Sequence, residues 1–450
     1  MRVDRTVMFS LLSLVAFMVE TCCGQPHSLP GITNILDLVI RRAARLSKVI
    51  SDPFISVARG VIQNAGQTLV KDPDVSAAYK GVPFYIKYKG YPVEVHKVST
   101  KDNVTLTIHR IPRQGAVPAV LQHGVMCSSF DFVANQPPQS LGFILWDAGY
   151  DVWMLNARGN IYSSDSAKSR QRFYEYTWDE LAAFDLPANI DYILTTTGHR
   201  NLHLMSHSRG TTVTIAMLAS KPDYNDKVRL ATMLAPVVYL DGMSQFLQNI
   251  VKFFSNPVIS YAVDVLTEGG PLFSNAHNDP SYFTLNPTLC SLELCPITND
   301  LSGNFFTSSG HHNKSRLAVY STHFPAGTTF NDLKHYIQLH KTKRFAYYDF
   351  EDPWKNIKAY GTARPPAYNL QNVRAKMLIF YAKNDSFISV RDGRKVVERF
   401  RDNLYKDTAI ELPHAGFVHM DFLWSIKAKE QLYDTIIKRM REIDGETPQS

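Results

Sequence analysis

Residues 201–220, NLHLMSHSRGTTVTIAMLAS, carry the strongest structural signal in the chain. The apolar run at 202–205 is short, as expected for a buried strand. Residues 210–218 are small or apolar on nearly every side, which predicts a buried helix. Between the two runs lies Ser206-His207-Ser208-Arg209-Gly210, a strand-to-helix turn with Ser208 at its apex.

Ser208 is therefore a candidate nucleophile. A sharp strand-to-helix turn of this kind, the nucleophile elbow, lifts a serine hydroxyl clear of its neighbours and points it at a helix N-terminus. The usual pattern is Gly-x-Ser-x-Gly, and Ser206, which is still small, stands here in place of the first glycine. Taken alone, the stretch fits an ordinary strand–turn–helix corner as well as a catalytic elbow. The decision between them depends on residues elsewhere in the chain.

The composition is that of a folded globular protein. The chain has 450 residues, of which 45% are hydrophobic and 20% are charged, and its formal net charge is +7. A chain of this length can bury a large core, or form one domain that carries a substantial insertion. The Lys and Arg residues form no dense run, so we predict a mildly basic surface and no nucleic-acid partner.

The N-terminal residues predict export. Arg2 and Arg5 precede an apolar run at 7–19, and the sequence TCCG follows up to Gly24. This order is typical of a secretory signal peptide, which we assign to residues 1–24. The run is short for a membrane span and no later stretch is long and apolar enough, so we predict no stable span. Residues 25–75 contain a cationic helical stretch and are predicted to be an N-terminal helical segment or a propeptide.

The cysteine pattern agrees with an oxidising compartment. Cys290 and Cys295 lie in a polar, loop-like segment and are predicted to form a disulfide bond. Cys127 is then left over, and we interpret it as a small buried apolar residue.

Three N-glycosylation sequons also fit an exported protein. Those at Asn103 and Asn313 are predicted to carry glycans. The third, at Asn384, adjoins a candidate catalytic aspartate, Asp385, which a bulky sugar would block. We therefore expect Asn384 to stay unmodified.

Strand and helix patterns alternate through most of the chain. Apolar, β-rich runs predict strands at 93–98, 106–111, 116–122, 150–155, 202–205, 227–238 and 375–382. Helical patterns between several of them predict a mostly parallel sheet with helices on both faces. Residues 240–372 break the alternation with an apolar helical stripe, several prolines and a helical piece near 331–340. We predict a core built from 76–239 and 373–450, with 240–372 inserted as a helical cap.

A serine nucleophile needs backbone N–H groups that hold the developing oxyanion. The predicted strand at 116–122 runs into His123-Gly124-Val125, where the glycine lets the backbone approach a substrate closely. We place one donor at the N–H of Val125. The other is the N–H of Arg209, the residue after the nucleophile.

The remaining catalytic candidates follow the last predicted strand. Asp385 lies just past the strand at 375–382, where a carboxylate can fix the tautomer of an imidazole. His419 is the candidate general base and is expected at the start of the last helix, while His414 is the competing histidine. Serine, aspartate and histidine thus occur in the chain order of one known class of serine hydrolases.

These residues resemble the acid lipases, the family that includes gastric lipase, lysosomal acid lipase and their insect relatives. The matching stretches cover nearly the whole chain beyond residue 70: 91–112, 121–124, 141–159, 184–188, 207–212, 234–236, 323–327, 366–368, 384–385 and 419–424. The resemblance implies an α/β-hydrolase fold with a cap and a triad of Ser208, Asp385 and His419. It also implies oxyanion donors at Val125 and Arg209, and a lipid ester of glycerol or a sterol bound at a lipid–water interface. A secreted protein is expected, with the lysosome as the alternative.

Three residues depart from the family pattern: Ser206, Arg209 and Ser389. The altered elbow favours a second hypothesis, a catalytically weak or inactive relative that binds lipid. A peptidase or an acyltransferase on the same scaffold is a third, because a fold does not fix a function. The sequence has no His-Glu-x-x-His motif and no phosphate-binding glycine loop, so we predict neither a metal nor a cofactor.

Overall fold

The computed structural model describes residues 72–164, 173–256, 260, 263, 271–272, 311, 313–412 and 417–445. Several predictions concern residues outside these ranges: the signal peptide at 1–24, most of the segment at 25–75, the Cys290–Cys295 disulfide and the competing base His414. In the part of the chain that is described, no helix is long and apolar enough to cross a membrane.

One eight-stranded sheet forms the centre of the protein. Its strands are β1 (Glu94–Ser99), β2 (Thr105–Ile111), β3 (Pro118–Gln122), β4 (Asp151–Met154), β5 (Leu202–His207), β6 (Val228–Leu234), β9 (Met377–Ala382) and β10 (Leu404–Leu412). Their order in the sheet is β1-β2-β4-β3-β5-β6-β9-β10. The pairs β1–β2 and β2–β4 are antiparallel, and every later pair is parallel. The prediction of a mostly parallel sheet is confirmed.

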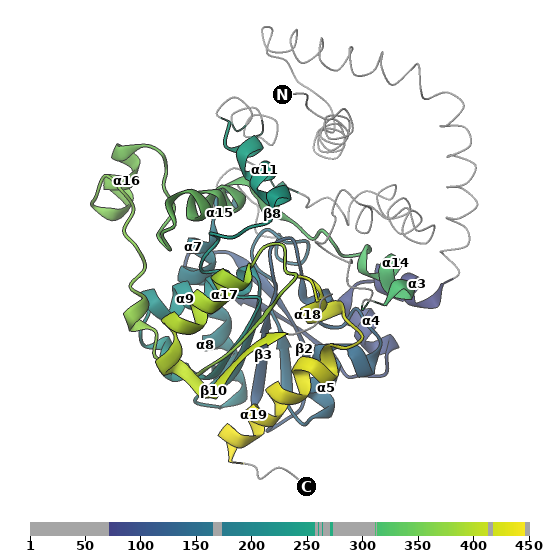
Figure 1. The fold of residues 1–450 in the computed structure, drawn as a ribbon. Coiled ribbons are helices and arrows are strands. Elements are labelled where there is room, and N and C mark those ends of the chain that lie inside the picture. Colours follow the sequence, from purple (N-terminus) through teal and green to yellow (C-terminus); the bar gives the residue numbers. More distant parts are fainter. Residues whose placement is uncertain are drawn as a thin grey trace, which may run out of the picture.

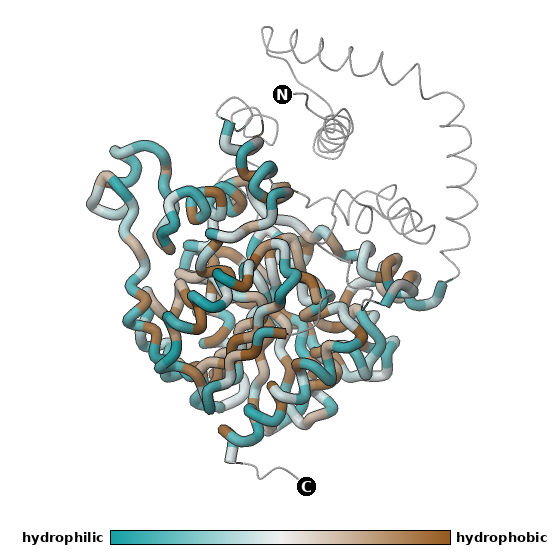
Figure 2. The backbone as a smooth tube through the Cα atoms, in the orientation of Figure 1, coloured by the Kyte–Doolittle hydropathy of each residue, from teal (hydrophilic) through white to brown (hydrophobic). Residues whose placement is uncertain are grey.

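The central strands are apolar because both of their faces are covered. Every residue of β3, β5 and β9 is buried, whereas the edge strand β1 has four residues that are exposed. Figure 2 shows the same contrast: hydrophobic residues are concentrated at the centre, and hydrophilic residues are more frequent around it. Continuous apolar runs are typical of parallel strands that lie between two layers of helices.

Helices cover both faces of the sheet (Figure 1). On one side lie α5 (Leu141–Asp147) and α19 (Asp434–Asp444), and on the other α8 (Leu186–Thr197), α9 (Arg209–Ser220) and α17 (Val390–Arg399). Shorter helices complete the core: α3 (Pro73–Tyr79), α4 (Val82–Tyr88), α7 (Trp178–Glu180), α10 (Tyr224–Lys227) and α18 (Asp421–Trp424). The expectation that His419 opens the last helix is wrong, because only the four-residue α18 follows it and α19 comes later.

The described elements between β6 and β9 lie mainly beyond the end of the sheet at which β5 ends (Figure 1). These elements are α11 (Gln245–Phe254), β7 (Pro271–Leu272), α14 (Leu317–Tyr320), β8 (Thr328–Thr329), α15 (Phe330–Thr342) and α16 (Pro353–Tyr360). We call this segment, 240–372, the insertion. Its helix α15 faces the start of α9, because the hydroxyl of Tyr336 donates a hydrogen bond to Oγ1 of Thr212 at 3.2 Å. The insertion therefore covers the edge at which β5 ends.

Strand β10 is not among the predicted strands, and its backbone explains why. The register with β9 shifts between Leu404 and Ala409, and Lys406 and Asp407 both have φ near +50°. Two left-handed residues in succession break the alternation of faces on which a strand prediction depends. Pairing with β9 stabilises this strand, although its own sequence lacks a strand pattern.

Candidate active site

Ser208 occupies a strained turn between β5 and α9. Its φ of 54° and ψ of −122° are unusual for a residue with a side chain, and it is the N-cap residue of α9. The turn is tight enough to require a glycine after it, because a Cβ at Gly210 would lie 2.6 Å from the carbonyl oxygen of Gln122. The local geometry is that of a nucleophile elbow.

Three of the predicted residues meet at this turn. Oγ of Ser208 lies 2.7 Å from Nε2 of His419, and Nδ1 of His419 lies 2.8 Å from Oδ2 of Asp385. The three residues are at most 6% exposed, so little water competes for these hydrogen bonds. Because a carboxylate accepts at Nδ1, the imidazole carries its proton there and Nε2 can accept the hydroxyl proton of Ser208.

The backbone after β9 fixes the orientation of Asp385. Its Oδ1 accepts hydrogen bonds from the N–H groups of Phe387 at 2.8 Å and Ile388 at 3.0 Å. Oδ2 is thereby left to face His419. Each oxygen of this carboxylate has a defined partner, which holds the side chain in one rotamer.

His207 supports the candidate base and was not identified from the sequence. Its Nε2 donates a hydrogen bond of 2.9 Å to the carbonyl oxygen of His419, because a carbonyl can only accept. Burial, with a smaller contribution from His419, lowers the pKa of His207 to about 3, so the ring is neutral. A histidine directly before the elbow serine is the only signal in the sequence for this contact.

The loop after β3 comes close to the elbow. A Cβ at Gly124 would lie 3.2 Å from Cβ of Ser208, a tight contact that a glycine avoids. His123 holds the loop: its Nδ1 donates to the carbonyl oxygen of Gly124 at 2.7 Å, and its Nε2 accepts from the N–H of Ala157 at 3.0 Å. The predicted donor at Val125 follows directly in this loop.

The insertion contacts the same loop. Met126, the residue after Val125, has φ of +57°, and its carbonyl oxygen accepts a 2.6 Å hydrogen bond from the N–H of Ala326. The carbonyl oxygen of Ala326 in turn accepts from the N–H of Ile161 at 2.9 Å. One residue of the insertion thus bridges the loops that follow β3 and β4.

The other predicted donor, the N–H of Arg209, belongs to the first residue of α9. The first N–H groups of a helix have no carbonyl partner within it, so this group is suited to a developing anion. The side chain of Arg209 forms an ion pair with the insertion, in which Nη1 lies 2.6 Å from Oδ2 of Asp332 in α15. Arg209 is 1% exposed and Asp332 is fully buried.

The structure accommodates the two serines that depart from the family pattern. The hydroxyl of Ser206 forms a 2.7 Å hydrogen bond with Oγ1 of Thr214 in α9, so its extra oxygen has a partner under the elbow. Ser389 is the N-cap residue of α17, where its Oγ accepts from the N–H of Asp392 at 3.1 Å. Both departures are structurally satisfied.

Of the other predicted positions, Asn103 is exposed in the turn between β1 and β2, Asn313 is half-buried and Asn384 is exposed. Their glycosylation states stay predictions. Cys127 is a free cysteine and is 2% exposed, as expected for a buried apolar residue. In the described residues, no group of three or more His, Cys, Asp or Glu side chains is arranged to hold a metal ion.

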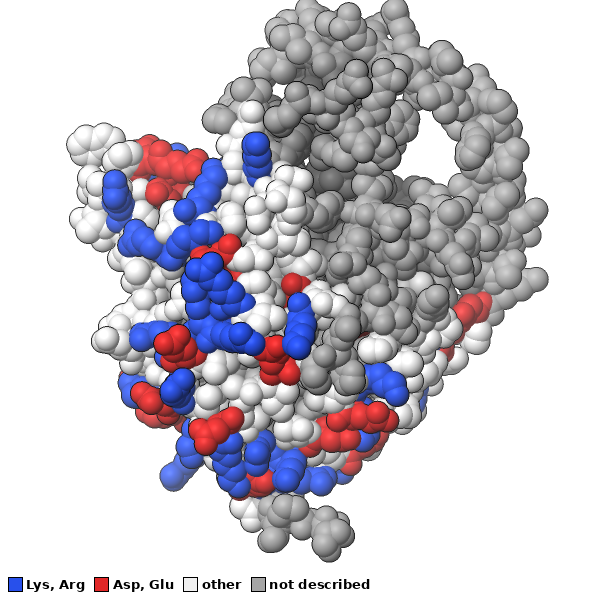
Figure 3. Space-filling view, viewed as in Figure 1, with Lys and Arg blue, Asp and Glu red and all other residues white. Residues whose placement is uncertain are grey.

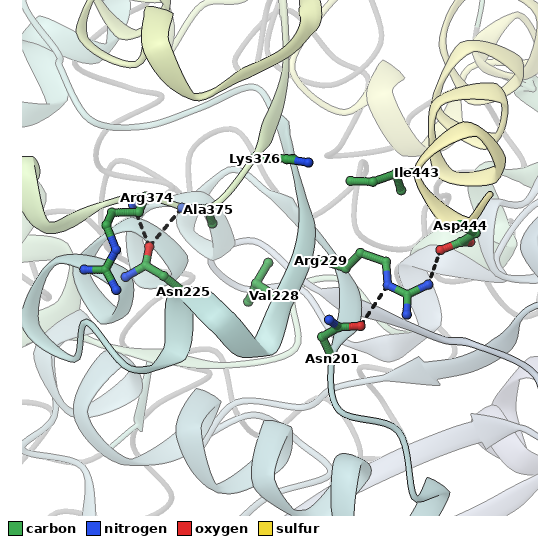
Figure 4. Close-up of a pocket in the computed structure, with 9 residues that line it drawn as sticks. All are labelled: Asn201, Asn225, Val228, Arg229, Arg374, Ala375, Lys376, Ile443 and Asp444. Atoms are coloured by element: carbon green, nitrogen blue, oxygen red, sulfur yellow. Dashed lines mark hydrogen bonds and ion pairs between the residues drawn. The ribbon is translucent and has the colours of Figure 1, made fainter.

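A surface pocket lies at the opposite end of the parallel strands, where β5 and β6 begin (Figure 4). It is lined by Asn201, Asn225, Val228, Arg229, Arg374, Ala375, Lys376, Ile443 and Asp444. In the figure Arg229 reaches both Asn201 and Asp444, and Asn225 accepts from the backbone of the chain before β9. None of the candidate catalytic residues lines it, so this pocket does not serve Ser208.

Comparison with known proteins places this geometry in a family. Residues 82–136 match the model for a partial alpha/beta-hydrolase lipase region, and residues 139–418 match the model for the alpha/beta hydrolase fold. Lipase 1 of Drosophila melanogaster is 36% identical over 366 residues, which cover 80% of this chain and 78% of that protein.

Two mammalian relatives are similar over most of their length. Gastric triacylglycerol lipase of Bos taurus is 32% identical over 83% of this chain and 94% of its own. Lysosomal acid lipase/cholesteryl ester hydrolase of Macaca fascicularis is 31% identical over 79% of this chain and 90% of its own. With the α/β-hydrolase fold and the elbow in place, the chain belongs to the acid lipase family of α/β-hydrolases and is a carboxylic ester hydrolase.

Proposed function

We propose that this protein is a secreted lipase that hydrolyses carboxylic esters of lipids, either acylglycerols or steryl esters, through Ser208, His419 and Asp385. The observation that carries the proposal is the unbroken hydrogen-bond chain from Oγ of Ser208 through both ring nitrogens of His419 to Asp385, at 2.7 and 2.8 Å. The names of the mammalian relatives support the substrate class, since they include a triacylglycerol lipase and a cholesteryl ester hydrolase.

The first half of the reaction forms an acyl-enzyme. Nε2 of His419 takes the hydroxyl proton of Ser208 as Oγ attacks the ester carbonyl carbon. The N–H groups of Val125 and Arg209 hold the negative oxygen of the tetrahedral intermediate. His419 then gives the proton to the alkoxide oxygen, and the alcohol leaves.

The second half regenerates the enzyme. Nε2 of His419 takes a proton from water as the water oxygen attacks the acyl carbon. Collapse of the second tetrahedral intermediate returns the proton to Oγ of Ser208 and releases the carboxylic acid. Asp385 keeps Nδ1 protonated and stabilises the imidazolium in both halves.

The exposed surface of α16 supports a lipid–water interface as the place of action. Trp354 is 80% exposed, and Phe350 and Ile357 are 41% and 42% exposed. These residues are three of the seven exposed large hydrophobic residues in the described chain, gathered within one short segment of the insertion. Tryptophan prefers the boundary between water and lipid, because its ring is apolar and its N–H is polar.

The charge distribution on one face of the described protein does not favour a nucleic-acid partner. Figure 3 shows Lys and Arg interspersed with Asp and Glu over the described part of this face. A nucleic-acid-binding surface instead concentrates positive charge in one stripe or patch.

Active-site labelling tests the enzymatic proposal. A fluorophosphonate probe should label the purified wild-type protein and leave Ser208→Ala unlabelled. The same two proteins should be compared on p-nitrophenyl and glyceride esters from acid to neutral pH. Equal rates for both would replace the enzyme with the lipid-binding alternative.

Export needs a separate measurement. Expression of the full chain in a eukaryotic secretory host, followed by N-terminal sequencing of the protein in the medium, should give a start close to residue 25. Retention of the intact N-terminus inside the cell would contradict the assignment of 1–24 as a signal peptide, whereas delivery of the cleaved chain to lysosomes would favour the lysosomal alternative.

A further inference from the structure

The side chain of Arg209 forms an ion pair that crosses from the elbow to the insertion. Nη1 lies 2.6 Å from Oδ2 of Asp332, and the same carboxylate oxygen accepts from Oγ1 of Thr328 at 2.9 Å. The backbone N–H of Asp332 donates to Oγ1 of Thr329, the N-cap residue of α15. The carboxylate of Asp332 is thus fixed at the first turn of α15. The position of α15 therefore determines where the guanidinium of Arg209 lies.

A buried ion pair of this kind is not explained by stability alone. Arg209 and Asp332 are almost completely removed from water, and the loss of hydration offsets much of their attraction. Within the described chain, Nε of Arg209 and Oδ1 of Asp332 also have no hydrogen-bond partner. The pair therefore costs hydration that a pair of apolar side chains would not cost, and what it contributes in return is a fixed geometry between α9 and α15.

That effect falls on α9, whose first N–H is a proposed oxyanion donor. A second contact between the two helices reinforces the pair, because the hydroxyl of Tyr336 donates to Oγ1 of Thr212. Oγ1 of Thr212 in turn donates to the carbonyl oxygen of Val237 at 2.8 Å. The first turn of α9 is therefore held to α15 at Arg209 and again at Thr212.

Helix α15 is itself firmly anchored, so it can act as a fixed reference. The ring of His335 stacks on Trp178 with ring centroids 3.4 Å apart, and its Nε2 donates to the carbonyl oxygen of Ala346 at 3.0 Å. At the other end of the helix, Nδ1 of His340 lies 2.5 Å from the carbonyl oxygen of Leu240.

The segment just before β8 contacts the loop that carries the other proposed donor. The N–H of Ala326 binds the carbonyl oxygen of Met126, and Met126 follows Val125 directly. One continuous stretch of the insertion, 326–332, thus contacts both backbone segments that carry the proposed oxyanion donors. These segments follow two neighbouring strands, β3 and β5, which the sheet pairs with Gln122 opposite Ser206, and the insertion adds a further connection between them.

We propose that Asp332 is a positioning residue for catalysis: through its ion pair with Arg209 it sets the first turn of α9 relative to the Met126 loop, so that the two oxyanion donors face the same point. This inference rests on the proposed role of the Ser208 site. It assigns to the insertion a part in the chemical step, in addition to any part in covering the substrate. A misplacement of one donor lowers the rate of the chemical step and leaves substrate binding nearly unchanged.

The test compares four variants on a soluble short-chain ester, with the wild type as reference: Asp332→Asn, Arg209→Gln, the double variant and Asp444→Asn. The last is the matched control, because Asp444 has a side chain that is only 6% exposed and is paired with Arg229 at the opposite end of the sheet. We expect Asp332→Asn and Arg209→Gln each to lower kcat by about 10- to 100-fold with KM within about twofold. The double variant should lose about as much as either single variant, because each change already removes the same ion pair.

Hydrogen exchange reports the positioning directly and does not depend on activity. In Asp332→Asn, the backbone amides of 123–127 and 208–212 should exchange faster than in the wild type, and in Asp444→Asn they should not. Unchanged exchange, or a kcat for Asp332→Asn equal to that of the control, would overturn the inference. So would a double variant whose loss is the product of the two single losses.

Failure of the proposed function gives a different result. If Ser208→Ala hydrolyses esters as fast as the wild type, the catalytic assignment is wrong. The exchange measurement still decides whether Asp332 orders the two segments.

Discussion

A histidine–aspartate pair lies at each end of the parallel strands, one at their C-terminal ends and one at their N-terminal ends. The side chains of both pairs are buried, and their surroundings give them different roles. At one end Nδ1 of His419 lies 2.8 Å from Asp385. At the other, Nε2 of His203 lies 3.1 Å from Asp444, and His203 belongs to the strand that leads to Ser208. By residue type, separation and burial, the pairs are nearly equivalent.

The difference lies in what the second ring nitrogen meets. Nε2 of His419 faces the hydroxyl of Ser208, whereas Nδ1 of His203 has no hydrogen-bond partner among the described residues. Asp444 also binds Arg229 and accepts from the hydroxyl of Tyr150 at 3.2 Å, so it ties the end of α19 to the sheet. We therefore assign the proposed catalytic role to the pair that faces a nucleophile at an elbow, and a structural role to the other pair.

The largest expected effect separates the two histidines. Ser208→Ala and His419→Ala should each lower kcat by about 10⁴-fold or more, and the double variant should lose little beyond either one. His203→Ala should leave kcat on a p-nitrophenyl ester near the wild-type value, since it changes only the opposite end. A folded His203→Ala protein as inactive as His419→Ala would contradict the assignment of the base.

The two aspartates should differ in the same way. Asp385→Asn should lower kcat by about 10⁴-fold, because an amide can hold the imidazole in the wrong tautomer. Asp444→Asn should keep kcat and lower the free energy of unfolding by about 1–3 kcal/mol, because Arg229 and His203 lose a charged acceptor. Steady-state kinetics and urea unfolding on both proteins measure the two quantities. Equal kcat values would remove the distinction between the two ends.

The two ends of the sheet should also differ in how their stability depends on pH, and Asp179 is the titrating group beside the insertion. Asp179 of α7 accepts from the hydroxyl of Tyr368 at 2.5 Å and from the N–H of Tyr348 at 2.8 Å, both in the insertion. Burial raises the pKa of Asp179 from the ordinary 3.8 to about 8. The folded state then holds a proton that the unfolded state loses, so this contribution to stability is complete below pH 3.8 and disappears as the pH rises through about 8.

Thermal unfolding from pH 4 to 9 checks this sign. Asp179→Asn keeps a neutral side chain at every pH, so its melting temperature should fall less than that of the wild type over this range. Parallel curves for the two proteins would show that Asp179 does not carry the dependence.

At the opposite end of the strands, the contribution of Asp444 to stability should depend on pH in the opposite direction. Burial alone would raise the pKa of Asp444, but the hydrogen bond from His203 and the ion pair with Arg229 outweigh it, and the net pKa is lowered. Its stabilising effect is therefore present above the ordinary carboxyl pKa of 3.8 and lost as the pH falls through the lower folded value. Asp444→Asn should be less sensitive to acid than the wild type, which unfolding at pH 2 to 5 would measure.

The smallest effect should come from the exposed surface of the insertion. Trp354→Ala is expected to lower activity on an emulsified glyceride about two- to fivefold through weaker adsorption, and to leave activity on a soluble ester unchanged. Tyr88→Ala is the control, because Tyr88 is a 44% exposed aromatic residue in α4, which lies on the other side of the molecule from α16 (Figure 1). Equal losses in both variants would point to a general effect of surface aromatic residues.

The sequence could predict the triad because each member lies close to a recognisable signal. Ser208 and Asp385 follow apolar runs that are readable as β5 and β9, and parallel strands bring their carboxyl ends to one edge of the sheet. Strand β10 was missed because Lys406 and Asp407 interrupt its alternation. The helix expected at His419 was misplaced, since the four residues of α18 are too few for a periodic pattern.

The fold class, the elbow and the order of the candidate catalytic residues could thus be read from the sequence. They follow from local patterns and from the rule that parallel strands end on the same side of a sheet. The ion-pair partner of Arg209 and the hydrogen-bond partner of the Ser206 hydroxyl became visible only in three dimensions. The tertiary structure also distinguished His419 from His203 as the ring that faces a nucleophile. These outcomes depend on residues far apart in the chain, such as Asp332 opposite Arg209, and the partner of a buried polar group is chosen by packing in three dimensions.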